Sequence, residues 1–142
     1  MASRFVGKHT LRTEGDIVTM NPGGDISLEE IIEVHDEIKR VLVRLGRVYV
    51  LSDNRRSAEM SPEVRRFLAD WNRANRVSAI AVINNGSYAV RMLATLVLRG
   101  ISLLRKDSPP IRIVASEAEA RRFFSSERRK FGHDSLSDLH PV

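Results

Sequence analysis

Short apolar runs alternate with helical segments along this chain, and this alternation restricts its fold more than any other feature. The runs at residues 48–51, 77–83 and 111–114 are rich in β-branched side chains, as expected for strands buried on both faces. Strands that alternate with helices form a largely parallel sheet with right-handed crossovers. We therefore predict an α/β domain with a mixed, mostly parallel five-stranded sheet and about four helices, in the order ββαβαβαβα.

The chain opens with two further strand segments. Residues 5–12 alternate loosely, residues 17–20 are Ile, Val, Thr and Met, and a turn is expected at positions 14–16 between them. This pattern predicts an opening hairpin. The Pro and Gly residues at 21–25 then end it, since Pro cannot donate to a sheet ladder.

The first helix has the clearest boundaries. Ser27 and Glu30 form a capping box, in which the hydroxyl and the carboxylate each accept from a backbone N–H that would otherwise lack a partner. Apolar residues recur at three- and four-residue steps over 28–45, and His35 lies on the same stripe. Gly46 is the expected C-terminal glycine.

Two later helices also begin at a serine. Ser61 precedes Pro62, which suits the first helical position, and this helix should end near Asn75. Ser116 and Glu119 form a second capping box, at the start of a helix that ends near residue 132.

Length and composition place the chain among ordinary globular domains. With 142 residues, 42% of them hydrophobic and 29% charged, it can bury a core without a metal or a disulfide. We predict one domain over residues 1–132 and a flexible tail over 133–142. The absence of cysteine excludes disulfides and thiolate sites, and favours the cytoplasm. The longest apolar stretch, 92–98, is too short to span a bilayer, and we expect no signal peptide.

The order of elements resembles a known family. A strand that ends in Asp53, and a last strand that leads into Ser-Glu-Ala-Glu-Ala-Arg-Arg-Phe at 116–123, are similar to the SpoIIAA-like branch of the STAS family, over residues 5–131. That resemblance implies a small binding protein of a bacterial regulatory system, which is phosphorylated on a serine at the start of its second helix. The family's Asp-Ser-Ser-Gly signature is absent here.

Ser61 and Ser57 are the candidate phosphorylation sites under this resemblance. Ser61 already has a structural role as a helix N-cap, and that is the interpretation we prefer. In the alternative, the helix dipole and the neighbouring Arg55 and Arg56 would accommodate a phosphate on either serine.

We find no pattern typical of a catalytic or metal site. No pair of the four histidines has the i, i+4 spacing of a helical metal site, and we expect His35 to be a core or core-edge residue. Asp53 is expected to cap the turn after its strand. The loop at Asn85, Gly86 and Ser87 joins a strand to a helix start, where an anion could bind, although a plain cap is the preferred interpretation. We expect no cofactor.

The segment 88–104 carries apolar residues around its whole circumference, which is more than one helix stripe needs. A helix of this kind must be covered on all sides, either by its own domain or by another chain. We consider a homodimer or partner interface and an ordinary core as equal alternatives. The candidate interface residues are Tyr88, Met92, Leu96, Leu98 and Ile101.

Basic residues gather in the last third of the chain, where residues 99–130 contain nine basic and four acidic side chains. A solvated helix face is the preferred interpretation, and contact with anionic lipid or an acidic protein is the alternative. Nucleic acid is disfavoured because few aromatic residues are interleaved with the charges. The candidate anion-binding residues are Arg121, Arg122, Arg128 and Arg129.

Three functions follow from these patterns. The first is a non-catalytic, STAS-like protein-interaction module that self-associates. The second is a peripheral membrane or small-ligand binder, similar to Sec14-like lipid carriers, that uses the basic C-terminal helix. The third is a hydrolase or transferase centred on Asp53, which a deep polar cleft beside that residue would favour.

Overall fold

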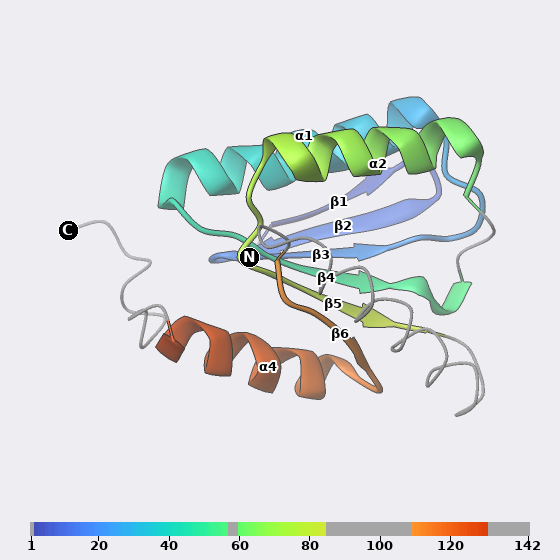
Figure 1. The fold of residues 1–142 in the computed structure, drawn as a ribbon. Coiled ribbons are helices and arrows are strands. Elements are labelled where there is room, and N and C mark those ends of the chain that lie inside the picture. The colour runs from blue at the N-terminus through green and yellow to red at the C-terminus, as the bar shows by residue number, and fades with distance from the viewer. Residues whose placement is uncertain (1, 57–59, 85–108, 131–142) are drawn as a thin grey trace.

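The computed structural model describes residues 2–56, 60–84 and 109–130. A six-stranded sheet runs through these residues, with its strands in chain order from one edge to the other. The first three strands are antiparallel, and the third to the sixth are parallel (Figure 1). The strands are β1 (Ala2–Val6), β2 (His9–Glu14), β3 (Ile17–Asn21), β4 (Tyr49–Asp53), β5 (Ala79–Ile83) and β6 (Ile111–Val114). The predicted mixed, mostly parallel α/β class is confirmed.

The opening of the chain differs from the predicted hairpin. Residues 5–12 are two strands, because the chain turns between Val6 and His9, which pair across the β1–β2 ladder. Gly7 takes a positive φ of 59° in this turn, a conformation that glycine adopts without steric cost. The sheet therefore has six strands where five were expected.

Helices cover both faces of the sheet. Helix α1 (Leu28–Leu45) and helix α2 (Pro62–Ala74) lie on one face, and α4 (Glu117–Lys130) lies on the other (Figure 1). A short 3₁₀ turn, η1 (Asn54–Arg56), follows β4. The apolar helical segment predicted at residues 88–104 and the predicted tail at 133–142 lie outside the described residues. In the part of the chain that the structure describes, no helix is long and apolar enough to span a membrane.

The predicted helix ends are present at α1 and α2. Glu30 N–H donates to the Ser27 hydroxyl at 3.1 Å, and Ser27 N–H donates to the Glu30 carboxylate at 2.9 Å. Gly46 ends α1 with a φ of 73°. Ser61 accepts from Val64 N–H at 3.3 Å. The predicted capping boundaries are confirmed for these helices.

The second capping box takes a slightly different form. The Ser116 hydroxyl accepts from Glu119 N–H at 3.2 Å, as predicted. The Glu119 carboxylate, however, accepts from Ala115 N–H at 2.7 Å, one residue before the serine. The start of α4 is therefore capped by both side chains, with the carboxylate satisfying a donor further back in the chain.

Two cores are present because successive side chains of a strand point to opposite faces. Val18 faces α1, whereas its neighbour Ile17 faces α4. The core under α1 consists of Val6, Leu11, Val18, Val34, Ile38, Val41, Val48 and Val77. The core under α4 consists of Ile17, Tyr49, Leu51, Ala79, Ala81, Ile83, Val114, Ala120, Phe123 and Phe124.

Candidate functional site

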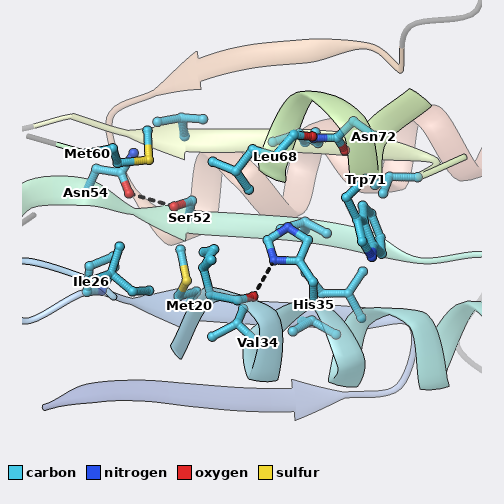
Figure 2. A pocket seen from close by; sticks show the side chains of 18 of the residues that line it. Met20, Ile26, Val34, His35, Ser52, Asn54, Met60, Leu68, Trp71 and Asn72 are labelled. Carbon is cyan, nitrogen blue, oxygen red and sulfur yellow. Dashed lines mark hydrogen bonds between the residues drawn. The ribbon is translucent and has the colours of Figure 1, made fainter. Parts of the chain in front are cut away.

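A cavity of about 380 Å³ lies between the sheet and the helices α1 and α2 (Figure 2). Its walls come from β3 and the loop after it, from α1, β4 and β5, and from α2 and Met60 just before that helix. The lining residues are Val18, Met20, Pro22, Gly24, Ile26, Ile31, Val34, His35, Ile38, Val50, Ser52, Asn54, Met60, Leu68, Trp71, Asn72, Val77, Ile80 and Val82.

The position and chemistry of this cavity suit a ligand. It reaches the ends of β3, β4 and β5 at Met20, Ser52 and Val82, the edge at which α/β sheets usually bind small molecules. Its size falls in the range of small-molecule sites, which is roughly 300–1,000 Å³. Among the described residues, no Asp, Glu, Lys or Arg lines it. The cavity is therefore an apolar site with a few neutral polar groups.

His35 is the ionisable residue on the wall of this cavity. Its Nδ1 lies 2.9 Å from the carbonyl oxygen of Ile31, one turn earlier in α1. A carbonyl oxygen can only accept, so Nδ1 carries the proton and Nε2 is left as an acceptor. Burial is the main cause that lowers the pKa of His35, and the ring is neutral at pH 7.

Aromatic contacts fix the orientation of the His35 ring. It meets Trp71 edge to face at 4.7 Å between ring centroids and Phe67 at 5.5 Å, and both partners belong to α2. Figure 2 shows the ring between α1 and α2, beside Leu68 and Trp71. The prediction that His35 is a core or core-edge residue is confirmed, since only 7% of it is exposed.

Two further polar side chains of the wall have local partners. The Ser52 hydroxyl donates to Asn54 Oδ1 at 2.6 Å, and Asn72 Nδ2 donates to the Leu68 carbonyl at 2.8 Å. In Figure 2, Asn72 and Trp71 come from α2, and Ser52 comes from the sheet. These bonds hold the polar groups of the wall in defined positions.

A second histidine anchors the rim of the cavity. His9 is fully buried, and its Nδ1 accepts from Gly23 N–H at 2.9 Å, so its proton lies on Nε2, which is 3.2 Å from the Glu30 carboxylate. The bond from the Ser27 backbone is the largest cause that lowers the pKa of Glu30, and His9 contributes further. His9 thus ties β2 to the loop that supplies Pro22 and Gly24 to the cavity.

Comparison with known proteins identifies the fold. No family model matches the chain, and no curated protein matches it. Its structure is similar to that of an uncharacterised protein of the DUF3478 family with a SpoIIAA-like fold, from Shewanella loihica. The two are 11% identical, the match covers 80% of this chain and 89% of that one, and the TM-score is 0.60. The fold of this chain is SpoIIAA-like. This confirms the fold that the sequence resemblance implied.

Asp53, at the end of β4 in this SpoIIAA-like fold, stabilises the turn that follows it. Its carboxylate accepts from Arg55 N–H at 3.3 Å, from the Arg55 side chain at 2.8 and 2.6 Å, and from Asn21 Nδ2 at 3.1 Å. The hydrogen bond from the Arg55 side chain is the largest cause that lowers the pKa of Asp53. The interpretation of Asp53 as a turn cap is confirmed.

The four arginines that the sequence suggested as anion-binding residues differ in their surroundings. Arg128 is buried, with its guanidinium 3.0 and 2.6 Å from the oxygens of fully buried Asp16, which also accepts from Arg47 at 3.1 Å. Its assignment to an exposed surface is therefore corrected. The reason is that Asp16 needs buried cations to offset its desolvation.

The other three arginines lie nearer the surface. Arg121 bonds to the carboxylates of Glu14 and Glu117, whereas Arg122 and Arg129 are exposed. Anion binding and peripheral membrane contact through these residues stay predictions. Among the described residues, no group of three His, Asp or Glu side chains is placed to hold a metal ion.

The remaining predicted sites fall largely outside the described residues. Ser61 is the N-cap of α2, and its phosphorylation stays a prediction. Outside the described residues lie Ser57, the loop residues Asn85, Gly86 and Ser87, and the interface residues Tyr88, Met92, Leu96, Leu98 and Ile101.

Sequence reasoning missed the cavity. His35 was expected to be a core or core-edge residue, which is correct as far as burial goes, and Trp71 of α2 is partly buried beside it. The available signal was that both are large rings with a polar nitrogen on helices that cover the same sheet face. Spacing alone cannot show whether the volume between two helices and a sheet is filled.

Proposed function

We propose that this chain is a non-catalytic regulatory domain of the STAS type that binds a small apolar ligand. The observation that carries the proposal is the cavity of about 380 Å³ between α1, α2 and the sheet. An opening of this size in a protein interior costs stability, since close packing is the rule. A ligand that fills the space would recover the lost contacts.

The polar groups of the site support binding in preference to catalysis. His35 is neutral, and its ring is held against Trp71 and Phe67. Asp53, which does not line the cavity, has its carboxylate occupied by Arg55 and Asn21. Aliphatic and aromatic surface with a few fixed polar groups is typical of sites that recognise a small molecule by shape.

Binding can be followed through the protein's own fluorescence, because Trp71 is the single tryptophan of the sequence and lines the cavity. We expect the neutral apolar dye N-phenyl-1-naphthylamine to bind with one-to-one stoichiometry, and to receive energy from excited Trp71. A dye signal that rises linearly without saturation would contradict the proposal.

Two matched variants locate the binding site. Val82→Phe adds a ring to the cavity wall and should weaken dye binding at least about tenfold, which corresponds to about 1.4 kcal/mol. Val43→Phe adds the same ring to α1, where Val43 is 72% exposed, and should leave binding unchanged. Equal effects of the two variants would place the dye elsewhere.

A protein-interaction module that self-associates is the second candidate function. Strand β1 forms one edge of the sheet, and its Phe5 is 76% exposed. An edge strand with an exposed aromatic side chain can pair with a strand of another chain. The apolar surplus at residues 88–104 supports the same candidate from the sequence.

The oligomeric mass tests this second candidate. If the wild-type chain is a dimer by light scattering, Phe5→Glu should give a monomer if the edge strand carries the contact, and Leu96→Glu should do so if the segment 88–104 carries it. A wild-type monomer at all accessible concentrations would reject self-association. Dye binding by such a monomer would still support the ligand-binding function.

A further inference from the structure

The unsatisfied acceptor of His35 gives the cavity a chemical preference. Its Nδ1–H is committed to the Ile31 carbonyl, and Nε2 has no hydrogen-bond partner among the residues that the structure describes. The residue is more than nine-tenths buried, but Nε2 is not among the fully enclosed unpaired side-chain atoms of the described residues, so this nitrogen is open to the cavity that His35 lines. An apolar ligand that fills the cavity would cover this acceptor and leave it without a partner, which is costly, and a ligand that donates to it avoids this cost.

The rest of the wall limits the charge of that ligand. No cationic side chain lines the described wall, so a carboxylate would enter without a counter-ion. No anionic side chain lines it either, so an ammonium group would be equally unpaired. Burial of an unpaired charge costs far more than burial of a neutral polar group.

The volume of the cavity restricts the class of ligand further. A cavity of about 380 Å³ lies near the lower end of the range for small-molecule sites. It suits one medium-length chain or a small ring system, and it is too small to enclose a phospholipid with two acyl chains. The wall is mainly aliphatic, with Met20, Ile26 and Leu68 facing the cavity from three different segments (Figure 2).

We propose that the cavity selects an uncharged, single-chain or ring-shaped apolar alcohol, whose hydroxyl donates to Nε2 of His35. This inference rests on the proposed ligand-binding function and specifies its ligand class. Trp71 and Phe67 hold the imidazole edge to face, so the acceptor is positioned before the ligand enters. The apolar chain then contacts the aliphatic wall.

Three probes of similar length test the proposal by displacement of N-phenyl-1-naphthylamine at about pH 7.5, where an unperturbed histidine is also neutral. They are n-decanol, methyl nonyl ether, which has no donor, and decanoate, which is charged. We expect decanol to bind about fivefold more tightly than the ether, the usual value of one hydrogen bond, and decanoate to bind at least tenfold more weakly than decanol.

A variant of His35 tests whether Nε2 causes the preference for decanol over the ether. His35→Phe keeps an aromatic ring against Trp71 and Phe67 and removes the acceptor. The ratio of decanol to ether affinity should then fall to about one, while the dye still binds. As the matched control, Val43→Phe places a phenylalanine on the exposed side of the same helix, outside the cavity wall, and should leave the ratio at its wild-type value.

A measurement on the wild-type protein keeps the test independent of folding of the variant. In nitrogen NMR, decanol should shift the resonance of His35 Nε2 and leave that of Nδ1, which stays bonded to Ile31, nearly unchanged. Equal binding of decanol and ether, or tightest binding of decanoate, would overturn the ligand class and leave the cavity function intact. Failure of the dye and all three probes to bind would overturn the proposed function itself.

Discussion

The two faces of the sheet are packed in different ways. Under α4, the rings of Tyr49 and Phe124 lie 5.3 Å apart and both residues are fully buried. The guanidinium of Arg128 lies 4.9 Å from the centre of the Tyr49 ring. Under α1 and α2, the same strands face a cavity of about 380 Å³. One face is thus closed by aromatic side chains, and the other contains a cavity.

The residues of β5 explain part of this difference. Ala79 and Ala81 face α4, and their small side chains leave room for Phe123 and Phe124 close to the sheet. Ile80 and Val82, on the other side of the same strand, face α1 and α2 and line the cavity. In β5 the smaller residues therefore face the better packed side of the sheet, because Phe123 and Phe124 of α4 fill the space next to them.

Loss of the buried ion cluster should give the largest effect. Asp16→Ala leaves Arg47 and Arg128 buried without the carboxylate that bonds to both. We expect a loss of about 3–5 kcal/mol in the free energy of unfolding, the usual cost of removing one partner of a buried ion pair. Urea denaturation measures this loss.

An exposed ion pair provides the control for that variant. Asp70 pairs with Arg73 on the surface of α2, and both side chains are more than half exposed. Asp70→Ala should cost less than about 1 kcal/mol. If Asp16→Ala cost no more than Asp70→Ala, the ion cluster would not be what fastens α4 to the sheet.

Substitutions at two neighbouring residues of β5 test the difference in packing, with an effect of intermediate size on stability. Ala81→Leu adds volume under α4, where the site is fully buried, and should destabilise the fold by about 1–3 kcal/mol. Val82→Phe adds more volume on the cavity side and should cost less than Ala81→Leu, because space is available there. Thermal unfolding compares the two variants, and the reverse order of stabilities would mean that the cavity is closed in solution.

Local signals in the sequence predicted much of the fold. The capping box of Ser27 and Glu30, the serine at position 61 and the apolar runs each depend on residues close in the chain, so spacing is sufficient to find them. The turn at Gly7 was missed because it contains one glycine followed by Lys8, without the Asn-Gly or Asp-Gly pair that marks most two-residue turns.

Long-range pairings could not be predicted in this way. Asp16 and Arg128 are 112 positions apart, and nothing in either neighbourhood indicates that they meet. Arg128 therefore looked like one more cation in a basic helix. The cavity has the same origin, since it depends on how far α1 and α2 stand from the sheet and not on the pattern within any one segment.

The smallest effect is expected in the pH dependence of stability, where the difference between the wild type and a variant without the His35 imidazole reports on the cavity face. Burial lowers the pKa of His35 below its usual value of 6.5, although the bond to Ile31 and the nearby Asp36 act in the opposite direction. As the pH falls through about 6.5, the unfolded chain takes up a proton at this residue before the folded chain does. The stabilising contribution of neutral His35 is therefore complete above that pH and is lost progressively below it.

His35→Phe removes the group that takes up this proton. The free energy of unfolding of the variant should therefore fall less than that of the wild type between about pH 7.5 and pH 5. The carboxylates of Glu14, Glu30 and Asp53 do not disturb this window, because their lowered pKa values make their own contributions disappear only at more acidic pH. Parallel curves for the two proteins in urea would mean that His35 is as accessible to protons in the folded state as in the unfolded one. Water would then already satisfy Nε2, and an alcohol would gain little by donating to it.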